Sequence, residues 1–200
     1  MPTGVALRDV RQQLFAAAER VLFRDGANGL TSRAVTEEAG VAKGVLHRHF
    51  ADFDDFLVEL VQERVARLDG LAEDLRGSAG TGTVAAHLTA ALIQLFDPVT
   101  VSVVGLIIFR DELRARLRQA LLVPGVPVLT QAAGVISAYL RDECEMGRIA
   151  ADADVDTLAL SLIGSAHMLF ADREQGPPDP ETVGKVVNTV IADVVQRRLL

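Results

Sequence analysis

The chain has 200 residues, of which 50% are hydrophobic and 4% aromatic, enough to bury one large core or two smaller ones. Its single cysteine, Cys144, excludes an internal disulfide and any metal site made of several cysteines, and it fits a reducing compartment. The sequence shows neither a signal peptide nor a run of about eighteen apolar residues, so we expect a cytoplasmic protein that does not span a membrane.

The formal net charge of −7 is unevenly distributed along the chain. Residues 1–50 contain seven Lys or Arg residues and five Asp or Glu residues, a balance of +2, which leaves −9 for the rest. A mildly basic head on an acidic body is what we expect if only the head contacts a polyanion.

Hydrophobic residues recur at helical spacing along nearly the whole chain, and no alternation typical of strands is visible. We therefore predict an all-α fold with about ten helices. Gly26 stands where a glycine commonly ends a helix, and Asp52 is a predicted N-cap for a long fourth helix with an acidic first turn. The predicted helices run, in chain order, over residues 8–25, 31–38, from the turn at 39–41 to about 50, 52–75, 83–96, 98–120, 127–146, 154–172 and 180–198.

Two short helices joined by a tight turn follow the first helix, which is the plan of a helix-turn-helix. Apolar residues such as Val35, Leu46 and Phe50 must point inward so that the two helices lock together, and Gly40 must allow the turn. The opposite face of the second helix then enters the major groove of DNA. That face is supplied by Lys43, Gly44, Val45, His47, Arg48 and His49.

The stretch TSRAVTEEAGVAKGVLHRHF, residues 31–50, resembles the DNA-binding motif of the TetR family of transcriptional regulators. That motif is roughly T-S-x-x-I-A-x-x-A-G-V-S-K-G-T-L-Y-x-H-F. Residues 14–26 resemble the family's first helix, and residues 139–170 resemble its two dimerisation helices. The resemblance implies a helix-turn-helix DNA-binding domain over residues 1–51 and a ligand-binding and dimerisation domain over residues 52–200.

The resemblance also implies which residues contact DNA. The start of the second helix would contact phosphates, the start of the third helix would approach base edges, and an arginine of the first helix, Arg8 or Arg11, would reach phosphate or the minor groove. The expected DNA-binding residues are Arg8, Thr31, Ser32, Arg33, Lys43, Gly44, Val45, His47, Arg48 and His49.

Three positions depart from the family pattern. Ala42 lacks a hydroxyl that the family often has, and His47 replaces a tyrosine. Phe53 replaces a lysine and stands among Asp52, Asp54 and Asp55. Because lost phosphate contacts lower affinity, we expect weaker and more salt-sensitive DNA binding than is usual for the family.

Other interpretations of these residues are less favoured. The cations could form an ordinary solvated helix face, but the turn and the apolar spacing around them argue against it. His47 and His49 would point about 200° apart on a helix, so we expect no metal site and no cofactor. Cys144 and His167 could form a nucleophile–base pair, but the neighbouring carboxylates disfavour a thiolate, so we do not expect an enzyme.

The C-terminal part is rich in apolar residues that form either plain core or the wall of a ligand cavity. The family resemblance supports a cavity for an apolar small molecule, edged by a few polar groups. The predicted ligand-binding residues are Leu92, Phe96, Val103, Ile107, Arg110, Tyr139 and His167.

The helix predicted over residues 154–172 is apolar around much of its circumference, which exceeds what one buried face requires. We therefore expect a twofold homodimer through the helices at 127–146 and 154–172. Such a dimer contacts two half-sites about one DNA turn apart, hence a near-palindromic operator.

The function that we predict is a transcriptional repressor, which binds double-stranded operator DNA and is released by an apolar small-molecule effector. The alternative is a helical small-molecule-binding or protein-interaction dimer whose DNA-binding head is degenerate. The acidic cluster after the third helix is the feature that favours this alternative.

Overall fold

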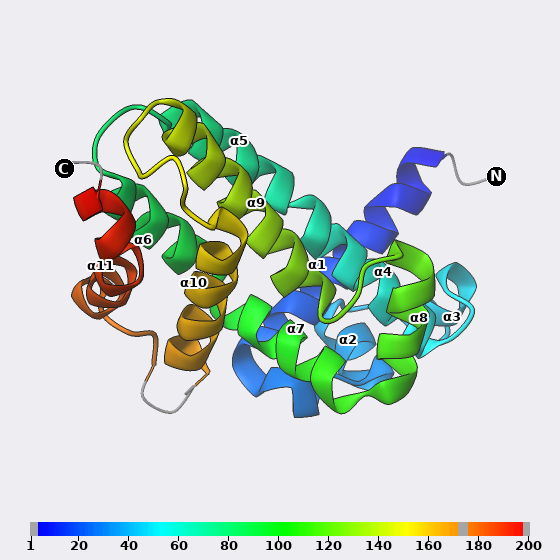
Figure 1. The fold of residues 1–200 in the computed structure, drawn as a ribbon. Coiled ribbons are helices and arrows are strands. Elements are labelled where there is room, and N and C mark those ends of the chain that lie inside the picture. The colour runs from blue at the N-terminus through cyan, green and yellow to red at the C-terminus, as the bar shows by residue number, and fades with distance from the viewer. Residues whose placement is uncertain (1–3, 172–175, 198–200) are drawn as a thin grey trace. The chain divides into compact units, whose positions relative to one another are not determined.

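The computed structural model describes residues 4–171 and 176–197, and these residues contain eleven α-helices and no strand (Figure 1). The all-α prediction is confirmed. The helices are α1 Gly4–Gly29, α2 Ser32–Glu38, α3 Leu46–His49, α4 Phe53–Ala66, α5 Leu68–Ser78, α6 Val84–Leu95, α7 Pro98–Phe109, α8 Asp111–Leu121, α9 Pro127–Glu145, α10 Val155–Phe170 and α11 Pro180–Arg197.

Two predicted helices are each divided in the structure. The helix expected over residues 52–75 breaks at Arg67, where ψ of −17° departs from the α-helical value and separates α4 from α5. The helix expected over residues 98–120 breaks at Arg110, whose extended backbone (φ −120°, ψ 95°) separates α7 from α8. Neither break carries a glycine or a proline, so the sequence pattern did not predict it.

The described residues form two compact units. The first unit combines the N-terminal stretch up to Arg64 with Pro98–Val126, and the second combines Val65–Asp97 with Pro127 onward. The division predicted from the sequence, a DNA-binding domain at residues 1–51 and a ligand-binding and dimerisation domain at residues 52–200, is a division by function and stays a prediction. The packing divides the chain elsewhere because α7 and α8 belong with the N-terminal helices.

In the first unit, α1 packs against α2 and α7. The backbone at Gly26 (φ 70°) is left-handed and interrupts α1 at the predicted place. Three phenylalanine rings pack together in this unit. The centroid of the Phe56 ring lies 5.5 Å from that of Phe15 and 5.0 Å from that of Phe50. Leu46 is fully buried in the same unit, as predicted for the inward face of the third helix.

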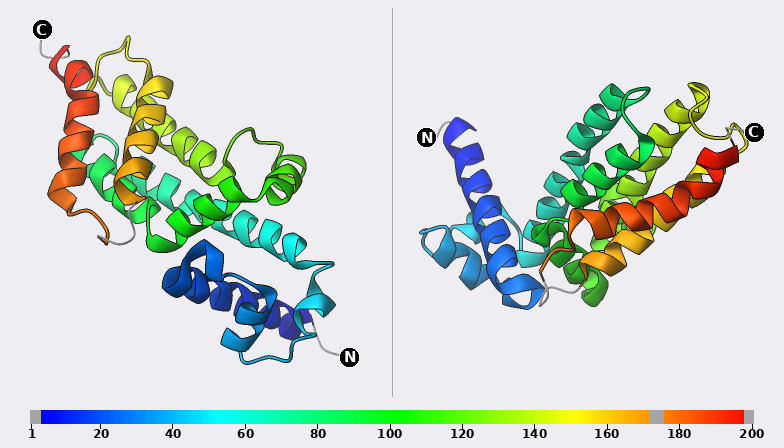
Figure 2. Two further views of the ribbon diagram at one scale, coloured as in Figure 1. Left: turned by 90° about the horizontal axis from the view of Figure 1, so that it is seen from below. Right: turned by 90° about the vertical axis from the view of Figure 1, so that its left-hand side faces the viewer.

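The second unit is a bundle in which α10 contacts both α9 and α11, while α6 contacts α11 and α5 contacts α9 (Figure 2). A buried polar network lies within it. The fully buried carboxylate of Glu143 accepts a hydrogen bond from the Tyr139 hydroxyl at 2.7 Å, and Arg148 Nε lies 3.1 Å from its other oxygen. Arg148 also donates to the carbonyls of Thr81 and Gly82, so the network holds the loop before α6.

No single helix within the described residues has both the length and the hydropathy to cross a membrane. In the part of the chain that the structure describes, one pair of helices, α6 and α7, reaches that measure together by length and composition, across the bend between them.

Candidate nucleic-acid interface

The first helix of the motif, α2, has a complete cap at each end. The Thr31 side chain accepts a hydrogen bond from the Ala34 amide at 3.1 Å, as an N-cap does. At the other end the Val41 amide donates to the Thr36 carbonyl at 3.0 Å, and the Gly40 amide donates to the carbonyl of residue 37 at 3.1 Å. These two bonds form a Schellman motif, whose left-handed position is Gly40 (φ 66°). The turn predicted at Gly40 is confirmed.

The second helix of the motif, α3, is a single turn that begins at Leu46. The predicted third helix ends where expected, because Phe50 has extended backbone (φ −135°). It starts later than expected, since Lys43 and Gly44 lie in a turn closed by the hydrogen bond from the Val45 amide to the Ala42 carbonyl at 2.8 Å. The predicted base-contacting residues therefore lie on this turn and on α3.

Lys43, His47 and Arg48 are exposed, and no ion pair or hydrogen bond of their side chains occurs among the described residues. Two arginines of α1 differ from them, because Arg20 and Arg24 bind the carboxylate of Glu38 at 2.7 and 2.9 Å. Next to α2 and α3, Lys43, His47 and Arg48 are therefore available to an anion, whereas Arg20 and Arg24 are already paired.

The remaining predicted DNA-binding residues surround this charge. Arg33 pairs with Glu37 at 2.7 Å, but both side chains are well exposed, at 72% and 62%, and such pairs exchange readily for another anion. A Cβ added at Gly44 would meet nothing within 4 Å, so the backbone is open to close approach there. Thr31 is exposed, and Ser32, Val45 and His49 are half-buried. The Arg8 side chain lies outside the described part of the structure.

Arg11 was the alternative to Arg8 as a predicted DNA contact. In the structure its side chain instead contacts α3, α4 and Phe50. Its guanidinium donates to the His49 carbonyl at 2.9 Å, pairs with Glu59 of α4 and lies 4.3 Å from the centre of the Phe50 ring. Gln13, two positions along α1, likewise donates to the Ala39 carbonyl at 2.8 Å. Side chains of α1 therefore satisfy carbonyls at the C-terminal ends of both α2 and α3.

Three carboxylates follow α3, and each has a partner. Asp52 caps α4 by accepting the Asp55 amide at 2.7 Å and pairs with Arg116 of α8 at 2.9 Å. Asp55 accepts the amide of residue 51 at 3.1 Å. Asp54 pairs with Arg110, at the start of α8, at 2.6 Å. The Asp55 amide first, and then Arg116, lower the pKa of Asp52, so this carboxyl is ionised at neutral pH.

The seven predicted ligand-binding residues are divided between the two units. In the second unit Leu92, Phe96 and Tyr139 are buried, and His167 is half-buried with its ring 6.2 Å from that of Phe96. The Tyr139 hydroxyl is engaged by Glu143 and by His87, and burial, aided by Glu143, raises the pKa of Tyr139. In the first unit Val103 and Ile107 are fully buried core residues, and Arg110 is the partner of Asp54.

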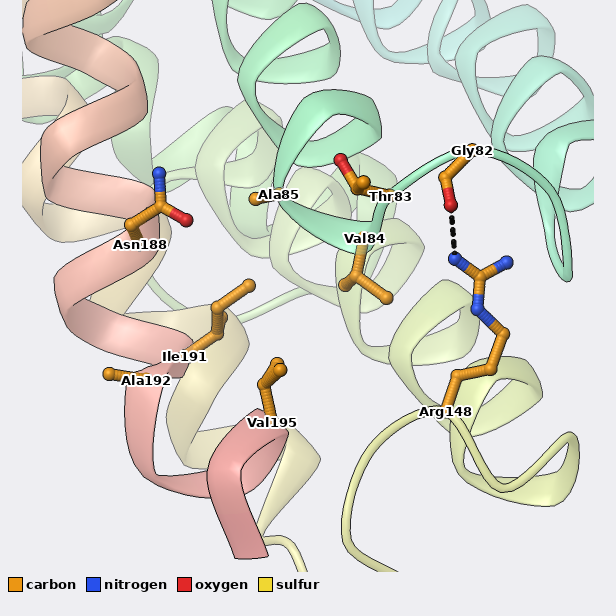
Figure 3. A pocket seen from close by; sticks show the side chains of 9 residues that line it. All are labelled: Gly82, Thr83, Val84, Ala85, Arg148, Asn188, Ile191, Ala192 and Val195. Carbon is orange, nitrogen blue, oxygen red and sulfur yellow. Dashed lines mark hydrogen bonds between the residues drawn. The ribbon is translucent and has the colours of Figure 1, made fainter. Parts of the chain in front are cut away.

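An open cavity of about 600 Å³ lies in the second unit between the start of α6 and α11 (Figure 3). The apolar side chains of Val84, Ile191 and Val195 form one part of its wall, and Arg148 forms a polar edge where it donates to the Gly82 carbonyl. None of the seven predicted residues lines it. The cavity could not be predicted from the sequence, because its residues come from three segments, at positions 82–85, 148 and 188–195, that lie at least 40 positions apart.

Metal and nucleophile chemistry have little support in the described residues. No group of three or more His, Cys, Asp or Glu side chains there could hold a metal ion. Burial raises the pKa of the Cys144 thiol, which disfavours the nucleophilic thiolate at neutral pH.

Known proteins match the head most clearly. The model of the family described as "Bacterial regulatory proteins, tetR family" matches residues 14–60, the segment that contains α2, α3 and most of α4. In this segment the chain has the sequence of a TetR-family protein. The resemblance noted in residues 31–50 is thereby confirmed.

Within the TetR family, two curated relatives match part of the chain. The HTH-type transcriptional repressor AcnR of Corynebacterium glutamicum is 32% identical over 73 residues, which cover 34% of this chain and 39% of AcnR. The HTH-type transcriptional regulator PksA of Bacillus subtilis is 34% identical over 68 residues, which cover 32% of this chain and 33% of PksA. The chain thus matches well under half the length of either relative.

Solved TetR-family structures share the fold over nearly the whole chain. FadR of Bacillus subtilis, solved in complex with stearoyl-CoA, is 18% identical with a TM-score of 0.68, covering 90% of this chain and 97% of FadR. A TetR-family regulator of Agrobacterium tumefaciens is 13% identical with a TM-score of 0.67, covering 96% and 98%. At these identities the likeness concerns the fold alone.

Proposed function

We propose that this TetR-family chain is a transcriptional repressor that binds a near-palindromic DNA operator through α2 and residues 42–49. The observation that carries the proposal is the exposed cluster of Lys43, His47 and Arg48, whose side chains lack a partner among the described residues. An exposed, uncompensated cation on the second helix of a helix-turn-helix is placed to bind phosphate or a base edge.

The rest of the motif supports this proposal by its rigidity. The Schellman turn at Gly40 and the buried Leu46 hold α3 against α2, while Arg11 and Gln13 hold the C-terminal ends of both helices to α1. A surface that is ordered before binding loses little conformational entropy when DNA arrives. Its exposed cations then contribute more of their electrostatic free energy to affinity.

A homodimer through α9 and α10 is the assembly that we propose. On α10, Leu160 and Met168 are 67% and 82% exposed although both are large and apolar. They lie four positions either side of Gly164, so the three residues share one face of the helix. Gly164 and Gly134 of α9 are exposed with nothing within 4 Å of an added Cβ, so a second copy of the two helices could approach closely. Two heads would then meet half-sites roughly 34 Å apart.

The proposed effector is an apolar small molecule that binds the second domain and releases the DNA. The effector can release the DNA only if it has a higher affinity for the form of the protein that does not bind the operator than for the form that does. FadR, one structural neighbour, was solved with stearoyl-CoA, which is an observation about that protein. The predicted residues that lie in the second unit, Leu92, Phe96, Tyr139 and His167, remain our candidate lining for the effector.

Selection of bound sequences from random DNA tests the proposed function directly. The expected result is an enriched near-palindrome, which then serves as the probe in a mobility-shift titration. Lys43→Ala and Arg48→Ala should each weaken binding, whereas Lys185→Ala on α11 and Arg76→Ala on α5 remove the same charges from the second unit and should not. If the wild-type chain enriches no sequence, the degenerate-head alternative is favoured and the repressor is not.

A further inference from the structure

The acidic start of α4 follows the recognition segment directly, and α8 lies against it in the first unit. Asp52 and Asp54 pair with Arg116 and Arg110 at 2.9 and 2.6 Å, although the partners are 64 and 56 positions apart in the chain. The Arg110 guanidinium also lies 5.8 Å from the centroid of the ring of Phe53, the residue between the two aspartates in the sequence.

These pairs change the charge that DNA would meet next to α3. Without α8 the first turn of α4 presents three carboxylates, at positions 52, 54 and 55, beside a segment that must approach phosphates. With α8 in place, two of those three negative charges have a guanidinium within hydrogen-bonding distance. Arg116 is shared with Glu112 of α8 at 3.4 Å, so Asp54 is the more completely compensated of the two paired acids.

The pairs are too exposed to matter chiefly for stability. The side chains of Asp52 and Arg116 are 49% and 35% exposed, and those of Asp54 and Arg110 are 21% and 36% exposed. Ion pairs at such positions contribute little to the free energy of unfolding. Exposed charges still act on an incoming polyanion within the screening distance of about 8 Å at physiological salt.

We propose that Arg110 and Arg116 set the DNA affinity of this chain without contacting DNA, by neutralising Asp54 and Asp52 beside the recognition segment. The inference rests on the proposed DNA-binding function. When Arg110 and Arg116 no longer pair with the two aspartates, the carboxylates of Asp54 and Asp52 repel the DNA phosphates and operator binding weakens.

The experiment is a double-mutant cycle on the selected operator. Arg110→Gln and Arg116→Gln should each weaken binding about three- to tenfold at low salt. Asp54→Asn and Asp52→Asn, combined with the matching arginine variant, should restore wild-type affinity because the repelling charge is gone. Asn is also a good N-cap, so Asp52→Asn keeps α4 intact.

The control is Arg118→Gln, which removes the same charge from an exposed position of α8 whose side chain has no partner among the described residues. It should leave affinity within twofold of wild type. Failure of the aspartate variants to rescue binding would overturn the inference, since the arginines would then contact DNA themselves or support the fold. An equal loss in Arg118→Gln would also overturn it. A wild-type chain that selects no DNA would instead overturn the proposed function on which it rests.

Discussion

Arg11 joins three helices of the head through one side chain. It donates to the carbonyl of His49 at the end of α3, pairs with Glu59 of α4 and lies over the ring of Phe50. Its sequence position near the N-terminus suggested a phosphate contact, and nothing local in the sequence shows otherwise. Its partners lie 38 to 48 positions away, so its role as a positioning residue emerges only from the fold.

Arg11→Met separates positioning from phosphate contact. We expect the variant to lose about 1–3 kcal/mol of unfolding free energy, because a carbonyl and a carboxylate lose their donor. Operator affinity should fall, while the slope of log affinity against log salt stays as in wild type. Lys43→Met is the comparison, and it should lower that slope by about 0.9 with little effect on stability. Urea unfolding and a salt titration measure both; a shallower slope in Arg11→Met would assign it a phosphate contact instead.

The same arithmetic corrects one expectation from the sequence. The sequence predicts weaker and more salt-sensitive binding, because Phe53 replaces a lysine that would contact phosphate and stands among acids. Fewer phosphate contacts make the salt dependence shallower, so the two effects do not go together. The aspartates could be recognised in the sequence as caps of α4, but their partners on α8 could not, because no periodicity links position 54 to position 110.

The turn between α2 and α3 is the element that the sequence predicted most securely. Gly40 adopts the left-handed backbone that its place after α2 required, whereas Gly44 has an ordinary backbone in an open turn. Apolar periodicity predicted where most helices lie. It did not predict the breaks at Arg67 and Arg110, because an arginine does not interrupt a helix by itself. The late start of α3 could not be predicted, because neither Lys43 nor Gly44 excludes a helix by itself.

The two glycines give a matched pair of variants. Gly40→Ala should lower the unfolding free energy by about 1–2 kcal/mol, because an alanine side chain strains the left-handed conformation. Gly44→Ala should change stability by less than about 0.5 kcal/mol but weaken operator binding, since the added methyl group stands where the backbone is open to DNA. Thermal unfolding and mobility shift distinguish them. Equal stability of the two variants would contradict the role assigned to Gly40.

The cap of α11 predicts a pH dependence. The Asp179 carboxylate accepts the amide and the hydroxyl of Thr182 at 2.9 and 2.7 Å, and the hydroxyl first, then the amide, lowers its pKa. A lowered pKa means that the stabilisation is complete above the ordinary value of about 3.9 and is lost as pH falls through the folded-state value. Asp179→Asn should therefore flatten the acid side of the curve of thermal midpoint against pH. Thermal unfolding measured over that pH range checks this, and a curve as steep in Asp179→Asn as in wild type would contradict the role assigned to the cap.

At the scale of the whole molecule, the sequence predicted two functions for two parts but not how the parts are built. Residues 98–126 were assigned to the body, yet their helices pack in the first unit with the head. The contacts that decide this are long-range, such as the hydrogen bond from the Ser102 hydroxyl to the Leu22 carbonyl at 3.2 Å. Apolar α7 is suited to burial in either unit, and composition alone cannot choose between them.

The proposed dimer gives a prediction at this scale. Leu160→Lys with Met168→Lys should convert a dimer into a monomer, because two charges would be buried in the interface. Sedimentation velocity measures the change. The control is Phe109→Lys, at an apolar side chain of α7 that is 87% exposed and lies in the first unit, which should leave the dimer intact. A wild-type chain that sediments as a monomer at micromolar concentration would contradict the interface.

The monomeric variant also tests how the dimer binds its operator. Two linked heads bind the second half-site intramolecularly, at an effective concentration near millimolar, so avidity exceeds the affinity of one head by about 10²–10⁴-fold. The Leu160→Lys, Met168→Lys chain should therefore lose that factor on the full palindrome and bind a single half-site as wild type does. A loss on the half-site as well would mean that the substitutions had damaged the head. An unchanged affinity for the palindrome would mean that one chain contacts the whole operator.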